Sequence, residues 1–175
     1  TKHANEMIAG QYSDYCDLAT IGLRYFNIYG KRQDPNSTYA AVIPKWINYV
    51  LTNKQVCIYG DGTTTRDFCS IDEVVKANIL ACFNKTTNNK TFNKVFNIGM
   101  GKELSLNGLY NAIIETSKKH NIVYQHEPLY EDFIKGDIKH SCANIELARR
   151  ELNFNPSTNF TSELDNLFNW IINHE

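Results

Sequence analysis

The amino-acid sequence predicts an α/β fold. Short apolar runs typical of buried strands alternate along the chain with longer segments whose apolar residues recur at helical spacing. There is no internal repeat and no Pro- or Gly-rich linker, and 175 residues are enough for about one domain. A composition of 42% hydrophobic and 21% charged residues is that of an ordinary globular protein.

The first third of the chain is expected to contain a helix, a strand and a second helix. Residues 2–14 have apolar side chains at helical spacing. Residues 20–28 form an apolar and aromatic run typical of a buried strand, in which Arg24 would need a partner. Residues 39–51 are expected to form a helix with Pro44 in its first turn, where proline is tolerated.

Strands and capped helices are also expected in the rest of the chain. Residues 55–59 have the pattern of a short strand, and Ser70 to Glu73 match a capping box that would start a helix. The further expected elements are an exposed loop at 85–94, a strand at 95–98, a helix capped by Ser105 that runs to about residue 119, a helix capped by Asn144 that ends at 152, and a last helix at 161–173.

Charge and composition exclude several classes of protein. The net charge is −1 and both signs are dispersed, which argues against a nucleic-acid-binding surface. No run approaches the ~20 apolar residues of a membrane span. The five cysteines contain no C-x-x-C pair and the five histidines lack metal-ligand spacing, so we expect neither a disulfide framework nor a metal site. A reducing, cytoplasmic setting fits best.

The first residues of the chain, Thr1 to Glu6, have the composition of a helix interior, without a start methionine or a cap. We therefore expect the chain to be a fragment of a longer protein.

Four short motifs follow one another along the chain. They are LRYFNIYG at Leu23–Gly30; QDPN at Gln33–Asn36 with YAAVIPKW at Tyr39–Trp46; IYGDG at Ile58–Gly62 with RDF at Arg66–Phe68; and FNIG at Phe96–Gly99 with GDIKHS at Gly136–Ser141. Together they resemble the C-terminal half of extended short-chain dehydrogenase/reductases, over nearly the whole chain. QDPN, AAVIPKW and GDIKHS are narrower and resemble the bacterial UDP-N-acetylglucosamine 4-epimerases used in surface polysaccharide synthesis.

The resemblance implies an organisation in two parts. Residues 1–30 and 70–101 would supply the last elements of a Rossmann-like NAD(P)-binding domain. Residues 31–69 and 102–175 would form a smaller α/β lobe that binds the nucleotide sugar. The resemblance also implies NAD as cofactor, a UDP-sugar as substrate, and a homodimer of the full-length protein formed partly by the helix that carries Lys2.

The implied reaction interconverts UDP-GlcNAc and UDP-GalNAc, or UDP-Glc and UDP-Gal, through a 4-keto intermediate. In that family a tyrosine removes the proton of the sugar 4-hydroxyl while hydride passes to NAD. Lys2 matches the lysine that holds the cofactor ribose and favours tyrosinate, although alone it would be taken for a solvated helix lysine. The tyrosine would lie four residues before Lys2 and is absent, so the chain alone is expected to be inactive.

Arg66 is expected to clamp the diphosphate of the substrate. A guanidinium is a permanently charged fork that suits phosphate oxygens. The structural alternative is an ion pair with Asp67 or Asp72.

Further contacts follow from the same resemblance. Asn27 would follow a strand end, where α/β sheets bind ligands. Cys57 and Tyr59 would read uracil through backbone groups of a strand edge. The other positions expected at the substrate are Gln33, Ala41, Val42, Asp137 and Ser141, of which Ala41 would leave room for an N-acetyl group. Those expected at the nicotinamide are Tyr25 and Phe26, which could equally be core residues.

The chain departs from the family at one charged position. The family usually has an arginine three residues before Asp137, where this chain has Ile134 followed by Lys135. A lysine is a point charge and not a fork, so the nucleotide could bind more weakly, by roughly 1.5–3 kcal/mol.

Two other functions stay open at this point. A sugar-nucleotide 4,6-dehydratase or a UDP-glucuronate decarboxylase would share the cofactor and most of the motifs. A non-catalytic binding or assembly module would keep the fold without the reaction, and it should not bind UDP.

Overall fold

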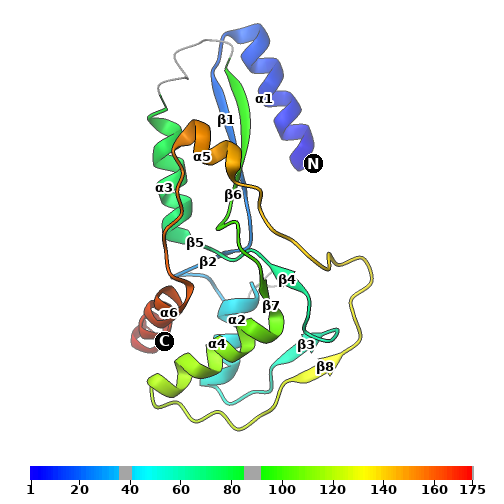
Figure 1. Cartoon of the computed structure of the whole chain (residues 1–175), viewed down its shortest axis with the longest axis vertical. Coiled ribbons are helices and arrows are strands. Elements are labelled where there is room, and N and C mark those ends of the chain that lie inside the picture. Colours follow the sequence, from blue (N-terminus) through cyan, green and yellow to red (C-terminus); the bar gives the residue numbers. More distant parts are fainter. Residues whose placement is uncertain (36–40, 85–91, 175) are drawn as a thin grey trace.

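The computed structural model describes residues 1–35, 41–84 and 92–174. The chain is α/β, as the sequence predicts, and it is elongated, with two groups of elements along its length (Figure 1). One group surrounds a pair of long strands, and the other contains three helices and short strands. Among the described residues, no helix is both long and apolar enough to cross a membrane.

The first group is built on two parallel strands. β1 (Thr20–Tyr25) pairs with β6 (Asn93–Ile98), from Thr20 opposite Asn93 to Tyr25 opposite Ile98. Three helices belong to this group: α1 (Lys2–Cys16), α3 (Ile71–Cys82) and α5 (Glu146–Leu152). Its core consists of Cys69, Val74, Ala77, Phe96, Ile98, Ala148, Leu152 and Phe154. α5 therefore packs with the parallel strands, although it belongs to the residue range that the resemblance assigns to the smaller lobe.

The second group has a helical core with short strands beside it. Its helices are α2 (Val42–Leu51), α4 (Leu106–Lys119) and α6 (Phe160–His174), and α4 packs against both of the others. Three further strand pairs complete the fold: β2 (Ile28–Tyr29) with β5 (Cys69–Ser70), β3 (Cys57–Tyr59) with β8 (Leu129–Glu131), and β4 (Thr65–Arg66) with β7 (Leu104–Ser105). The first two pairs are parallel and the third is antiparallel.

Most of the expected helices are confirmed, with small changes of their ends. Pro44 lies in the first turn of α2, and the Ser105 hydroxyl accepts a 3.0 Å hydrogen bond from the Gly108 N–H at the start of α4. Asn144 accepts a bond from the Glu146 N–H, but the N-cap residue of α5 is Ile145. Residues 39 and 40 of the expected second helix lie outside the described residues.

Two strand predictions need correction. The strand expected at 20–28 ends at Tyr25, because Asn27 adopts a positive φ of 22° and turns the chain into β2. Arg24 is exposed and not buried, and its guanidinium holds both carboxylate oxygens of Glu6 at 2.7 and 2.6 Å. The loop expected at 85–94 is too long, since β6 already begins at Asn93; residues 85–91 lie outside the described part.

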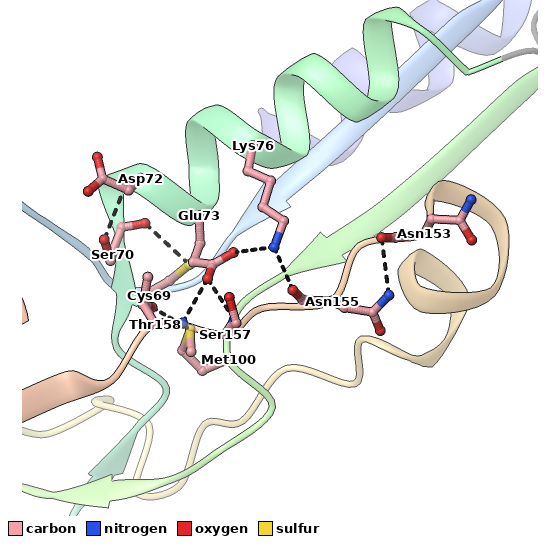
Figure 2. Close-up of polar contacts among 10 residues, drawn as sticks. All are labelled: Cys69, Ser70, Asp72, Glu73, Lys76, Met100, Asn153, Asn155, Ser157 and Thr158. Carbon is pink, nitrogen blue, oxygen red and sulfur yellow. Dashed lines mark hydrogen bonds and ion pairs between the residues drawn. The ribbon is translucent and has the colours of Figure 1, made fainter.

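Only one of the two hydrogen bonds expected of a capping box forms at the start of α3. Ser70 accepts a bond from the Asp72 N–H, as an N-cap should, but the Glu73 carboxylate does not return to the cap. It is buried, and its Oε1 accepts the backbone N–H groups of Ser157 and Thr158 at 2.7 and 2.9 Å (Figure 2). Glu73 thus joins α3 to the segment that leads into α6.

Candidate functional site

Arg66 lies where three segments meet. Its NH2 group donates to both carboxylate oxygens of Asp137, at 2.8 and 2.9 Å, and its NH1 group donates to the Thr65 carbonyl at 2.9 Å. Only 15% of the Arg66 side chain is exposed. The sequence left open an ion pair of Arg66 with Asp67 or Asp72. Neither carboxylate binds this guanidinium.

The segment after Asp137 runs beside β4. The Thr65 N–H donates to the Lys139 carbonyl at 3.0 Å, and the Ser141 N–H donates to the Thr65 carbonyl at 3.2 Å. The Thr65 hydroxyl also lies 3.0 Å from Nδ1 of His140. These bonds bring Arg66 together with Asp137 and Ser141, which lie more than seventy residues further along the chain. Nothing in the sequence indicates this contact between His140 and Thr65.

Within the described residues, β3 pairs with β8 along one edge and has no strand partner along the other. The Leu129 N–H donates to the Val56 carbonyl and the Gly60 N–H donates to the Glu131 carbonyl, both at 2.8 Å. The backbone groups of Val56 and Gly60, on either side of β3, therefore point toward β8, as do those of Ile58 between them. Because these directions alternate along a strand, the N–H and C=O groups of Cys57 and Tyr59 point to the other edge. That is the arrangement an imide base requires.

The surroundings of Cys57 connect β3 to α2. Burial, and then the negative charge of Glu131, raise the pKa of the Cys57 thiol, while the charge of Lys45 in α2 lowers it. The α2 helix starts at Val42, with Ala41 as its N-cap residue. Val42 packs against the apolar core of the second group, so its side chain serves packing in this structure.

A second cation, Lys139, lies near the turn that joins β3 to β4. The Asp61 carboxylate accepts bonds from the backbone and the hydroxyl of Thr63 at 2.9 and 2.6 Å. These hydrogen bonds, and the nearby charge of Lys139, lower the Asp61 pKa. Lys139 therefore lies near the turn that joins the Cys57–Tyr59 strand to the Arg66 strand.

Asn27 precedes β2 and Gln33 follows it in the chain. The Cys69 N–H donates to the Asn27 carbonyl at 3.2 Å, which links Asn27 to the segment that carries Arg66. The Asn27 side chain is exposed. Gln33 instead closes a turn, since its amide accepts from the Gly30 N–H at 3.3 Å and donates to the Ile28 carbonyl at 3.1 Å.

Lys2 and Tyr25 lie elsewhere, beside a cavity of about 750 Å³ between α1 and β1. Both residues line it, together with other residues of α1, β1 and β6. The Tyr25 hydroxyl donates to Asn78 in α3 at 3.1 Å. Phe26 is half-buried and its backbone N–H donates to the Ile98 carbonyl at 2.9 Å, so it continues the parallel ladder.

Comparison with known proteins shows the family of the chain. Residues 1–99 match the model of the NAD dependent epimerase/dehydratase family. A protein of Methanocaldococcus jannaschii described as a putative UDP-glucose 4-epimerase is 33% identical over 99% of this chain and 52% of its own length. The chain thus spans about half the length of this curated relative.

Two solved structures share the fold closely. The UDP-glucose 4-epimerase of Thermotoga maritima, solved with UDP-glucose, is 31% identical with a TM-score of 0.88, over 98% of this chain and 52% of that one. The UDP-N-acetylglucosamine 4-epimerase of Methanobrevibacter ruminantium M1, solved with UDP-N-acetylmuramic acid, is 35% identical with a TM-score of 0.87, over 99% and 53%.

Proposed function

The chain belongs to the NAD-dependent epimerase/dehydratase family, and on that premise we propose that the whole protein is a UDP-N-acetylhexosamine 4-epimerase. The observation that carries the proposal is the meeting of Arg66, Asp137 and Ser141, a few residues along the chain from the end of β3. Relatives that match nearly the whole chain are named as UDP-sugar 4-epimerases, which favours epimerisation over dehydration or decarboxylation.

The substrate would bind along β3 and β4. The backbone groups of Cys57 and Tyr59 would pair with uracil, and Arg66 would bind the diphosphate as a charged fork. Asp137 now holds that guanidinium, so it either keeps Arg66 in place or yields to the phosphate oxygens. Asn27, Gln33 and Ser141 would lie at the sugar.

The preference for an acetamido sugar rests on small residues. Ala41 stands at the start of α2, and Ser141 is the last residue of the segment that is bonded to Thr65. Neither side chain would crowd an N-acetyl group. Of the two solved relatives described above, the UDP-N-acetylglucosamine enzyme is 35% identical and the UDP-glucose enzyme 31%, which is consistent with this choice.

The residues of this chain fit one side of NAD. Lys2 lines the cavity beside β1, where its ammonium group could donate to the ribose hydroxyls, and Tyr25 lines the same cavity. When bound, NAD accepts a hydride from the sugar and returns it. Lys2 would also lower the pKa of the catalytic tyrosine that the resemblance puts four residues upstream. We accordingly expect the 175-residue chain by itself to be inactive.

We also propose that the whole protein is a homodimer that pairs through α1. Apolar side chains on this helix are widely exposed in the described chain, among them Met7, Ile8, Tyr12 and Tyr15. Helical spacing puts Ile8, Tyr12 and Tyr15 on one face. The cytoplasmic location and the role in surface polysaccharide synthesis stay predictions.

The test is a turnover experiment on the whole protein. Incubated with NAD and UDP-GlcNAc, it should form UDP-GalNAc, detected by proton NMR of the anomeric signals. UDP-glucose serves as the comparison substrate and should react more slowly. Formation of a 4-keto-6-deoxy sugar or loss of CO2 from UDP-glucuronate, without any epimer, would replace the proposal by the dehydratase or the decarboxylase.

A further inference from the structure

The carboxylate of Asp67 joins two distant segments of the chain. Asp67 is completely buried, and its two oxygens accept three backbone N–H groups. Oδ1 accepts from Met100 at 2.8 Å, and Oδ2 accepts from Gly101 at 2.9 Å and from Ala143 at 3.1 Å. Bonds to a charged, buried acceptor are among the stronger hydrogen bonds in proteins.

The two segments belong to different functional regions. Met100 and Gly101 form the turn directly after β6, whose end is bonded to Phe26 through the Ile98 carbonyl. Ala143 lies two residues after Ser141, in the segment that runs beside Thr65. Asp67 thus connects the end of the parallel strands to the residues expected at the substrate.

Arg66 and Asp67 are neighbours at the end of β4, and their side chains face different ways. Successive residues of an extended segment point in opposite directions. Arg66 therefore faces Asp137 while Asp67 faces the interior.

The Asp67 carboxylate is closely packed against Gly99. A Cβ atom added to Gly99 would lie 2.7 Å from Oδ2 of Asp67 and 2.7 Å from the Ala143 side chain. Contacts of this length do not occur at real Cβ atoms, so position 99 needs glycine to let the carboxylate approach. This close approach is independent of the three hydrogen bonds.

We propose that Asp67 is a positioning residue that aligns the substrate-binding segment, with Arg66 and Ser141, against the end of the parallel strands beside which the cofactor would lie. The proposal rests on the proposed function. Asp67 would not touch the substrate; it would set how the sugar, held from one side, meets the nicotinamide, held from the other.

The substitution Asp67→Asn tests this alignment. Both oxygens of Asp67 are acceptors, so in either amide orientation the new NH2 group opposes at least one backbone N–H. We expect kcat for epimerisation by the whole protein to fall by about tenfold or more, because small misplacements of reacting groups are costly. The Kd for UDP should change by less than about threefold, since Arg66 keeps its own bonds to Thr65 and Asp137.

The matched control is Asp72→Asn, which makes the same chemical change at an exposed carboxylate on the first turn of α3. It should leave kcat within about twofold of the wild type. An Asp67→Asn protein with unchanged kcat, or with kcat lowered only as far as UDP binding is lost, would overturn the proposal.

A second variant covers the case in which Asp67→Asn does not fold. Gly99→Ala keeps the carboxylate and its charge but pushes against it. A folded Gly99→Ala protein should also lose kcat while it retains UDP. If it turns over like the wild type, or if neither variant folds, Asp67 serves only the stability of the fold and the proposal is wrong.

A crystal structure separates this proposal from the proposed function. In Asp67→Asn the 99–101 turn or the 139–143 segment should move relative to Arg66 by about 0.5 Å or more, whatever the reaction. That shift, in a protein that epimerises no UDP-sugar, would reject the proposed function and keep the positioning role. An unmoved structure would reject the positioning role alone.

Discussion

Oε1 of Glu73 accepts a 2.7 Å hydrogen bond from the backbone N–H of Ser157, 84 residues further along the chain. Thr158 donates to the same oxygen, and Oε2 lies 3.6 Å from the Lys76 ammonium group. Lys76 in turn donates to the Asn155 carbonyl at 2.6 Å (Figure 2). One buried carboxylate in the first turn of α3 thus orders the segment that connects α5 to α6.

The Glu73→Ala substitution should therefore destabilise the fold strongly. It leaves two backbone N–H groups without their acceptor and creates a void in a buried site, which costs about 3 kcal/mol. Urea unfolding followed by circular dichroism measures the change. The exposed Glu115 in α4 provides the control, because Glu115→Ala should change stability by less than about 0.5 kcal/mol. Equal effects of the two substitutions would show that the Glu73 network contributes little.

The Arg66→Gln substitution should weaken the binding of UDP by about 10- to 100-fold, because it removes a charge-assisted contact to the diphosphate. Calorimetric titration of the whole protein with UDP measures this. Arg149→Gln is the control: Arg149 is an exposed arginine of α5 whose 2.7 Å ion pair with Glu146 lies within one helix turn. A variant at Arg66 with normal affinity for UDP would remove this residue from the site.

The Ile134→Arg substitution should have the opposite effect. Ile134 is exposed and lies three residues before Asp137, so an arginine there would add a second guanidinium near the diphosphate. We expect UDP to bind about tenfold more tightly, with a steeper loss of affinity as salt is added. Ile138→Arg adds the same charge at another exposed position nearby and should change the affinity less. If both variants bind UDP equally, position 134 has no specific role.

Cys69 should resist alkylation in the folded protein. Burial, and then the charges of Asp67 and Glu73, raise the pKa of its thiol to about 12, whereas Cys16 and Cys82 are exposed. At pH 8 iodoacetamide should label the three exposed cysteines, Cys16, Cys82 and Cys142, and leave Cys69 unmodified until the chain unfolds, as read by mass spectrometry of peptides.

The same shift has a consequence for stability at high pH. The folded state favours the neutral thiol, so its contribution is complete below about pH 9 and is lost as the pH rises toward about 12. Cys69→Ala should lose less stability over that range than the wild type. Early labelling of Cys69, or identical alkaline profiles, would contradict the buried position of this thiol.

Local sequence signals predicted the larger elements and the short strand β3, but not β4 and β8. The helices at Ser70 and Ser105 could be foreseen because their caps are local. β4 and β8 have two and three residues, and each exists only because a distant segment pairs with it. Nothing in the residues 129–131 themselves indicates a strand.

In the candidate site, too, the residues within local motifs could be predicted, whereas contacts between distant segments could not. The family motifs singled out Arg66, Asp137 and Ser141, and the fold brings them together. For Asp67 the sequence suggests only an ion pair with Arg66, which the structure does not contain. Its three bonds come from residues 33 to 76 positions away, so only the folded chain reveals them.

The most direct test of the account is a crystal structure of the whole protein with UDP bound. We predict uracil paired with the backbone groups of Cys57 and Tyr59, and the diphosphate on the Arg66 guanidinium. UDP bound at another place, with Arg66 still held by Asp137 and remote from every phosphate, would contradict it.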